Sequence, residues 1–436
     1  MHASQRRRSR TVRPGDSALR GALALLVAAA VAGCFRARDD AADARVAEAA
    51  TTPAAREVRP GIEVLLSDSV HLVAGRRVGL VTNHTGVDRL GRSDIDLLHE
   101  HPDVELVAVF APEHGLRGDA DPGEAVEDGR DARTGVPVFS LYGRVRKPTP
   151  EMLDGVDVLL IDYQEVGARY WTYASTMTLA MEAAGERGIP AVVLDRPNPI
   201  GGAVQGNVLD PTFATFVGRF PVAMRHGMTP GELARYYAGE FGIAVELHVV
   251  PIDGWRHDLP FEDTGLPWLA PSPNMPDRVS ALHYPGTCLF EGTNLSVARG
   301  TDRPFQQIGA PWLDGQALAR AMRAYDLPGV RFEPVRFTPH GPGDGKSDGV
   351  EVEGVRLIAT GPDYDPTRTA VALLVEARRQ AGDRWRWLQA HFDRLAGTDR
   401  LRLGIEAGLP PEALTADWDA QLDAFRRARA RYLLYP

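Results

Sequence analysis

The chain has 436 residues, of which 44% are hydrophobic, 25% charged and 7% aromatic, and its formal net charge is −9. This composition is typical of a globular protein and excludes wholesale disorder, collagen and a coiled coil. The length predicts two domains with at least one sizeable core. Because an acidic chain does not attract nucleic acid over long distances, we expect no nucleic-acid partner.

Residues 1–33 have the features of a secretory signal. Several arginines precede the short apolar run GALALLVAAAVAG, which ends at Cys34 and is too short and too rich in alanine for a membrane span. The run VAGC also matches a bacterial lipobox, in which the cysteine is lipidated and becomes the new N-terminus. The alternative is a plain signal peptide followed by a chance cysteine.

The cysteine count favours lipidation. Cys34 and Cys288 are the only cysteines, so no disulfide framework is available and Cys34 has no other evident role. Residues 34–60 are polar, rich in alanine and without apolar periodicity, which predicts a flexible tether. We therefore expect export across the cytoplasmic membrane as a periplasmic or cell-surface lipoprotein, with the lipid anchor as the only membrane contact.

From about residue 60 the pattern alternates between strands and helices. The predicted strands are short and almost continuously apolar, as in a parallel sheet that is buried on both faces. They are Arg76–Thr82, Val104–Pro112, Gly155–Asp162 and Pro190–Asp195. With helices predicted at Thr172–Arg187 and Pro230–Phe241, this alternation indicates a doubly wound α/β domain.

After Phe305 the order of elements changes. The predicted elements there are a helix at Asp314–Tyr325, strands at Val330–Thr338 and Gly349–Leu357, and a helix at Pro366–Gln380. This mixed order predicts a second, smaller α+β domain. We place the α/β domain at residues 61–285 and the C-terminal domain at 286–436.

Each of the four predicted strands runs into a polar motif: NHTG, PEHG, DYQEVGARYWTY and DRPNP. In doubly wound sheets the ligand crevice lies outside the carboxyl ends of the strands, so these motifs are expected to converge. The candidate site residues that they contribute are Asn83, His84, Glu113, His114, Asp162, Glu165, Arg169, Tyr170, Trp171 and Asn198.

Glu113 and Glu165 are candidates for the paired carboxyl groups of a glycosidase, in which one acts as acid and the other as nucleophile or base. The alternative is that each is a solvated carboxylate or a structural cap. Tyr170 and Trp171 either stack on a sugar ring or pack at the start of a helix.

The segment Ala270–Phe305 is rich in proline, glycine and asparagine and resembles a functional loop. Arg299 in this segment either holds an anionic group or makes a structural salt bridge. His226, in MRHGMT, either enters the crevice or is structural. The loop's candidate site residues are Asn274, Glu291, Asn294, Arg299 and Thr301.

Several sequence matches to known catalytic or binding motifs lack the flanking structure that those motifs require. GKSDG matches G-x-S-x-G, but it follows a glycine- and proline-rich stretch where a serine hydrolase has a buried strand. No G-x-G-x-x-G follows the first strand, which argues against dinucleotide binding. A metal site built from Glu113, His114 and Asp162 is an alternative that no ligand spacing supports. We expect neither a cofactor nor a metal.

The chain resembles a bacterial family whose characterised members are NamZ-type exo-β-N-acetylmuramidases. The resemblance spans about residues 61–436 and rests on the stretches GLVTNHTG, FAPEHGLRG, VPVFSLYG, DVLLIDYQEVGARYWTY, LDRPNPIGG, PNMP, YPGTCLFEGTNLSVARGTDRPF and YLLY. It implies a Rossmann-like domain, a smaller C-terminal domain and an active-site cleft between them. It also implies release of N-acetylmuramic acid from non-reducing ends of peptidoglycan fragments, during cell-wall turnover and recycling.

On this resemblance Glu113 is the first catalytic carboxyl group, and Glu165 or Glu291 is its partner. The lactyl carboxylate of such a substrate implies that Arg299 or Arg169 lies in the cleft. Two other hypotheses remain open from the residues alone, a metal-dependent hydrolase or esterase of wall material and a non-catalytic wall- or sugar-binding lipoprotein.

Overall fold

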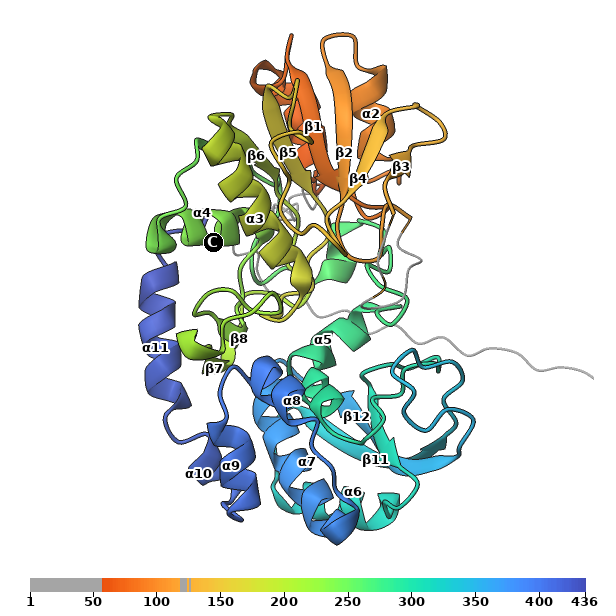
Figure 1. Ribbon diagram of the computed structural model, residues 1–436. Coiled ribbons are helices and arrows are strands. Elements are labelled where there is room, and N and C mark those ends of the chain that lie inside the picture. The colour runs from red at the N-terminus through yellow and green to blue at the C-terminus, as the bar shows by residue number, and fades with distance from the viewer. Residues whose placement is uncertain (1–56, 118–123, 125–126) are drawn as a thin grey trace, which may run out of the picture. The chain divides into compact units, whose positions relative to one another are not determined.

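The structure is a computed structural model that describes residues 57–117, 124 and 127–436 (Figure 1). The described residues from 57 onward belong to one compact unit. The predicted signal segment, the predicted lipidation at Cys34 and most of the predicted tether lie outside the described residues. Across the described ranges, no helix combines the length and the apolar character that a bilayer crossing requires.

A seven-stranded sheet organises the first half of the described chain, in the order β3-β4-β2-β1-β5-β6-β9. Its strands are β1 (Arg77–Thr82), β2 (Glu105–Ala111), β3 (Gly129–Arg130), β4 (Pro137–Ser140), β5 (Val158–Asp162), β6 (Ala191–Leu194) and β9 (Leu247–Val250). Every neighbouring pair is parallel except β3 with β4. The predicted parallel sheet is therefore confirmed, and β1, β2, β5 and β6 agree with the four predicted strands within three residues at either end.

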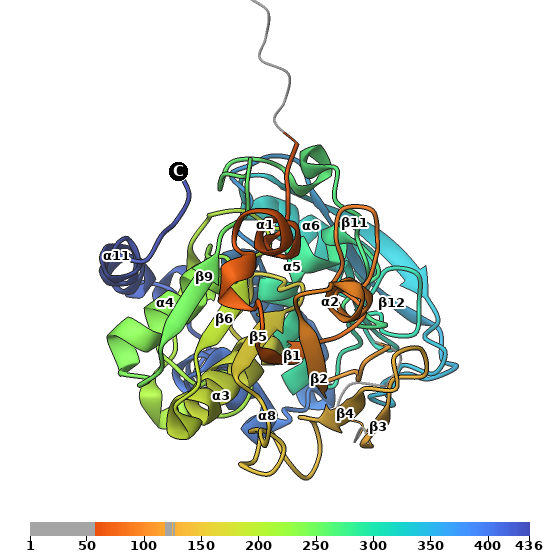
Figure 2. The same ribbon diagram turned by 90° about the horizontal axis from the view of Figure 1, so that it is seen from above.

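Both faces of this sheet are covered by helices, as Figure 2 shows in a view along the strands. The helices nearest to it are α1 (Gly61–Asp68), α2 (Asp94–Glu100), α3 (Thr172–Arg187) and α4 (Pro230–Phe241). On β5, Val158 and Leu160 pack in one core cluster with α1 and α2, whereas Leu159 and Ile161 pack in a second cluster with α3 and α4. Burial on alternate faces explains why these strands read as continuous apolar runs.

The helices α3 and α4 begin and end at the predicted residues, because local signals mark their ends. In α4, Thr229 and Glu232 form a capping box around the N-terminus, and Pro230 occupies the first helical position. Gly188 and Gly242 end α3 and α4 in the left-handed conformation, with φ of 71° and 70°.

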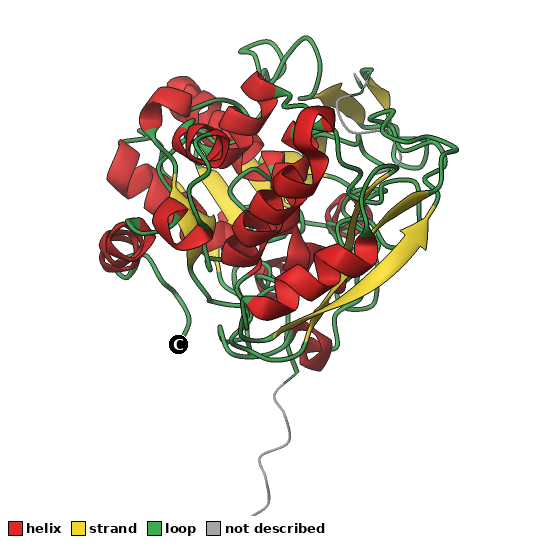
Figure 3. Cartoon of the chain, turned by 90° about the horizontal axis from the view of Figure 1, so that it is seen from below, coloured by secondary structure: helices red, strands yellow, loops and turns green. Residues whose placement is uncertain are grey.

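The second half contains an antiparallel sheet in the order β10-β12-β11, against which α6 packs (Figure 3). Its strands are β10 (Gln307–Ala310), β11 (Val330–Phe337) and β12 (Val352–Ala359). The helices of this half are α5 (Arg278–Thr287), α6 (Gly315–Ala324), α7 (Pro366–Ala381), α8 (Gln389–Ala396), α9 (Arg400–Glu406), α10 (Pro411–Leu414) and α11 (Trp418–Arg429). The smaller C-terminal domain with mixed α and β structure is thus confirmed.

The structure adds elements to the predicted organisation and differs from it at two boundaries. The strands β3, β4, β9 and β10 and the antiparallel ribbon of β7 (Gln205–Val208) with β8 (Ala223–Arg225) were not predicted, since strands of four residues or fewer lack a long apolar run. Residues 57–60, placed in the tether, belong to the fold, because Val58 is buried beside Ile252 and Trp255. The predicted domain boundary after residue 285 falls inside α5, and the division into two domains there stays a prediction.

Candidate active site

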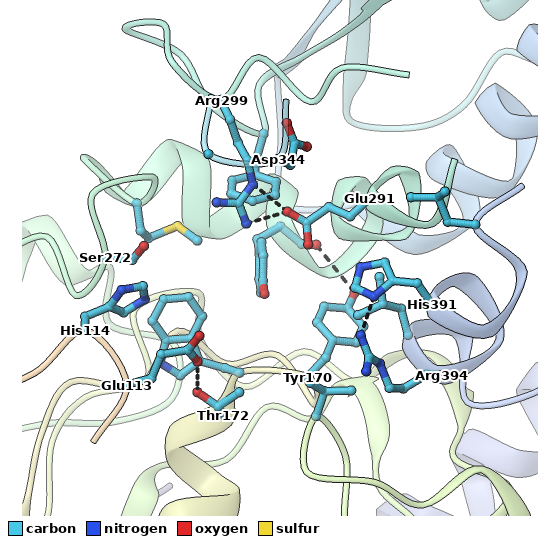
Figure 4. Close-up of a pocket in the computed structure, with 18 of the residues that line it drawn as sticks. Glu113, His114, Tyr170, Thr172, Ser272, Glu291, Arg299, Asp344, His391 and Arg394 are labelled. Atoms are coloured by element: carbon cyan, nitrogen blue, oxygen red, sulfur yellow. Dashed lines mark hydrogen bonds and ion pairs between the residues drawn. The ribbon is translucent and has the colours of Figure 1, made fainter. Parts of the chain in front are cut away.

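A cavity of about 390 Å³ is lined by side chains from both halves of the described chain. Its polar lining consists of carboxyl groups, cations, imidazoles and hydroxyl groups, with a cluster of aromatic rings beside them (Figure 4). These residues are Glu113, Glu291, Asp344, Arg299, Lys346, Arg394, His114, His391, Thr172, Ser272, Tyr142, Tyr170, Trp171, Tyr284 and Phe305. The size and the mixed lining are those of a small-molecule site.

Glu113 reaches the cavity from a tight turn after β2. The backbone N–H of Gly115 donates to the carbonyl of Pro112 at 3.0 Å, and His114 adopts a left-handed φ of 71°. The hydroxyl of Thr172, the first residue of α3, donates to Oε2 of Glu113. Tyr142 is also hydrogen bonded to Glu113, and burial together with the Glu113 charge raises the pKa of Tyr142 above its usual value. The turn and two hydroxyl groups therefore fix the position of the carboxyl group.

Glu291 lies in a 3-10 turn, Cys288–Gly292, that follows α5. Nε and Nη2 of Arg299 lie 2.7 and 2.5 Å from its Oε1, and the Cys288 thiol lies 3.6 Å from its Oε2. Burial alone would raise the pKa of Glu291, but the charge and hydrogen bonds of Arg299 outweigh it, so this pKa lies below its usual value. Glu291 is thus held as a carboxylate.

Two further segments complete the cavity wall. Lys346, from the loop between β11 and β12, donates to the carbonyl oxygens of Glu291 at 2.8 Å and Phe290 at 3.3 Å, which anchors the turn. On α8, Nη2 of Arg394 donates to Nδ1 of His391. Burial lowers the pKa of His391, so its imidazole is neutral. Since Nδ1 accepts a hydrogen bond, the proton of this ring resides on Nε2.

This geometry suits acid–base chemistry on a glycosidic bond. Glu113 and Glu291 enter the cavity from opposite sides in Figure 4, and they come from the two halves of the chain. Two carboxyl groups that flank a bond are the usual equipment of glycosidases. Within the described residues no group of three or more His, Cys, Asp or Glu side chains is placed to hold a metal ion.

Comparison with known proteins decides the family. The family model described as exo-β-N-acetylmuramidase NamZ, N-terminal, matches residues 78–279, and the corresponding C-terminal model matches residues 282–435. The chain belongs to the NamZ family of exo-β-N-acetylmuramidases. It is 44% identical over 382 residues to the peptidoglycan β-N-acetylmuramidase NamZ of Bacillus subtilis strain 168, which covers 87% of this chain and 92% of that protein.

Two crystal structures of DUF1343 family proteins from Bacteroides fragilis share the fold. One is 37% identical, with a TM-score of 0.81 over 88% of this chain and 100% of the other. The second is 31% identical, with a TM-score of 0.70 over 87% of this chain and 99% of the other. The predicted membership of the NamZ family is therefore confirmed along nearly all of the described chain.

The structure brings only part of the predicted site together in this NamZ-family cavity. The predicted residues that line it are Glu113, His114, Tyr170, Trp171, Glu291 and Arg299. The aromatic rings among them are buried and pack edge to face, with ring centroids of Tyr170 and Trp171 at 5.4 and 5.7 Å from that of Tyr284. This contact favours packing over an open stacking platform.

The remaining predicted site residues do not line the cavity, and most are held by protein partners. Asp162 pairs with Arg196, so the alternative metal site that needed Asp162 is not assembled. His226 is buried, and burial lowers its pKa to about 3. The side chain of Asn83 is hydrogen bonded to the Tyr173 hydroxyl, and the backbone N–H of Asn274 donates to the hydroxyl of Ser272. Four other side chains are hydrogen bonded to backbone carbonyl oxygens: His84 to Ala270, Asn198 to Met228, Asn294 to Arg384 and Thr301 to Ala298.

Arg169 and Glu165 also lie behind the cavity wall. The guanidinium of Arg169 donates to four backbone carbonyl oxygens, among them those of Asn207 at 2.9 Å and Ala396 at 2.8 Å. Glu165 is fully buried, and burial raises its pKa to about 8. Each is therefore placed to hold the fold together, and neither touches the space where a substrate would bind.

Other cavity residues were not predicted as site residues. Tyr142 and Thr172 stand inside two of the stretches that carry the family resemblance, VPVFSLYG and DYQEVGARYWTY. Their place in these motifs could have marked them as candidate site residues. Asp344 and Lys346 belong to the glycine-rich stretch around GKSDG, whose loop composition carried no function by itself. His391 and Arg394 stand in no recognisable motif, and only the docking of α8 brings them to the cavity.

Glu165→Gln is expected to leave turnover near the wild-type value and to change the pH dependence of stability. The unfolded carboxyl group loses its proton near pH 4.5, whereas the folded one keeps it to about pH 8. Unfolding therefore releases a proton between these values, and wild-type stability falls as pH rises through this window. Relative to the wild type, the free energy of unfolding of the variant should rise by on the order of a few kcal/mol between pH 5 and pH 9.

Urea unfolding of both proteins at pH 5, 7 and 9 measures this gain, with the exposed Glu105→Gln on β2 as a matched control. A stability difference that does not change with pH would contradict a buried, protonated Glu165. A large loss of turnover would instead give Glu165 a direct role in the reaction.

Proposed function

We propose that this chain is an exo-acting glycoside hydrolase that releases N-acetylmuramic acid from the non-reducing ends of peptidoglycan fragments. Family membership supports the glycosidase activity, and the relative from Bacillus subtilis is a peptidoglycan β-N-acetylmuramidase. The observation that carries the proposal is the cavity in which Glu113 and Glu291 face each other. Peptidoglycan fragments with a terminal muramic acid are the substrate, in cell-wall turnover and recycling.

In this proposal the two carboxyl groups have different tasks. Arg299 keeps Glu291 ionised, so Glu291 is the group that stabilises the positive charge that develops on the sugar ring in the transition state. Glu113 is then the general acid that protonates the departing glycosidic oxygen. Thr172 and Tyr142 are positioning residues, because their hydroxyl groups bind the Glu113 carboxyl group.

A pair of chromogenic substrates tests the activity. We expect the protein to release the chromophore from a β-N-acetylmuramide and to act far more slowly on the matching β-N-acetylglucosaminide. Release of free N-acetylmuramic acid from a peptidoglycan fragment, followed by mass spectrometry, is the second measurement. Binding of muramic acid without release of any sugar would overturn the proposal in favour of a binding protein.

We further propose that the protein is exported and anchored in a membrane through a lipid on Cys34. The support is in residues 1–34, which combine a basic start, a short apolar run and the sequence VAGC. A peptidoglycan substrate, which lies outside the cytoplasmic membrane, agrees with this location. Fractionation of cells tests it: the wild type is expected in the membrane fraction and Cys34→Ala outside it. Equal fractionation of the two proteins would overturn the anchor.

A further inference from the structure

We propose that Arg394 binds the lactyl carboxylate of the terminal N-acetylmuramic acid and is the residue that selects muramyl over glucosaminyl substrates. This inference rests on the proposed function, because it names the recognition element of the same cavity. N-acetylmuramic acid differs from N-acetylglucosamine by an O-linked lactyl group, and its carboxylate is the only charge that distinguishes the two sugars. A muramidase therefore needs a cation that is available to this carboxylate.

Three fixed cations line the cavity: Arg299, Lys346 and Arg394. Arg299 directs both Nε and Nη2 at Oε1 of Glu291 and has most of its side chain buried. Lys346 donates to two backbone carbonyl oxygens, and its amino group lies 3.7 Å from the carboxylate of Asp344. Both cations are therefore neutralised by carboxylates of the cavity itself.

Arg394 differs from the other two. Among the residues that the structure describes, no carboxylate forms an ion pair with it. One of its five N–H donors reaches Nδ1 of His391, and its Nε is buried without a hydrogen-bond partner in the described part of the chain. The side chain that lines the cavity thus keeps a positive charge that no carboxylate of the described chain neutralises, and a guanidinium is the group best shaped to meet a carboxylate with two donors.

The surroundings of Arg394 favour this contact. His391 beside it is neutral and carries its proton at Nε2, so it adds a hydrogen-bond donor and leaves Arg394 as the cation of this part of the wall. Figure 4 shows Arg394 with His391 on the wall that also carries Glu291, while Glu113 lies across the cavity. A lactyl carboxylate on this side leaves Glu113 free of a second anion. Arg169, the other arginine expected to serve the lactyl group, is buried on backbone carbonyl oxygens outside the cavity.

The test compares two substrates that differ only in this charge, a chromogenic β-N-acetylmuramide and the same compound with its lactyl carboxylate converted to an amide. Arg394→Gln is expected to lower kcat/KM for the acid about 10- to 100-fold and to leave the amide within about 3-fold of wild type. Arg394→Lys keeps the charge but loses the planar fork, so it should recover part of the loss. The exposed Arg427→Gln on α11 is the matched control and should behave as wild type.

The outcomes separate this inference from the proposed function. Wild-type turnover of the acid substrate supports the glycosidase activity by itself. Equal losses on acid and amide in Arg394→Gln, or no loss on the acid, would overturn only the role of Arg394. If the glutamine variant does not fold, the wild type still decides, because equal kcat/KM on acid and amide would show that the charge is not recognised.

Discussion

Glutamine in place of Glu113 is expected to lower kcat by about 10²- to 10⁴-fold while the fold and the binding of N-acetylmuramic acid persist. The amide has the shape of the carboxyl group and still accepts the hydrogen bond of Thr172, but it has no acidic proton to give to the glycosidic oxygen. The loss should fall on kcat, because proton transfer belongs to the transition state. Steady-state kinetics on the chromogenic muramide measure it.

Two comparisons make this result specific to Glu113. Glu127→Gln changes an exposed carboxyl group and should retain wild-type turnover. A substrate whose leaving group is a strongly acidic phenol needs little protonation, so Glu113→Gln should lose less on it than on an alkyl glycoside. Turnover near the wild-type value on both leaving groups would exclude Glu113 as the general acid.

Much of the fold could be predicted because its signals are local. Val158–Asp162 of β5 is buried on both faces, so every residue in the run is apolar up to the final aspartate. α3 ends at a glycine in the left-handed conformation, and α4 begins at a capping box. The short strands β4, next to the edge strand β3, and β9, at the opposite edge, carry no such run, because their partly buried residues leave only a weak alternation.

The site was harder to predict because it depends on the direction in which each side chain points. Glu113 and Glu165 both follow a strand end, yet Glu113 faces the cavity and Glu165 is buried behind it. Loops have no periodicity from which such a direction can be read. Arg394 depends on contacts that are distant in the sequence, because only the docking of α8 against the turn that carries Glu291 brings it into the site.

Methionine in place of Arg299 is expected to impair both activity and stability, because it leaves Glu291 buried without its partner. Removing one member of a buried ion pair costs about 3–5 kcal/mol. In the wild type the Arg299 charge holds the pKa of Glu291 below its usual value, and this contribution to stability is present above that value and is lost in acid. In the variant the charge of Lys346 still opposes burial, but the charge and hydrogen bonds of Arg299 are gone, so the pKa of Glu291 rises and the acid limb of kcat/KM moves to higher pH.

The pH–rate profile and urea unfolding between pH 4 and pH 8 measure these two effects. The stability gap between variant and wild type should widen as pH rises, because ionising a buried Glu291 that has lost the Arg299 ion pair becomes the dominant cost. Arg299→Met combined with Glu291→Gln should recover stability without recovering turnover, since the buried charge is gone but so is the catalytic carboxylate. Arg303→Met, on the same loop and exposed, is the control. A uniform loss of activity with no movement of the acid limb would mean that Arg299 acts on the reaction by a route other than the ionisation of Glu291.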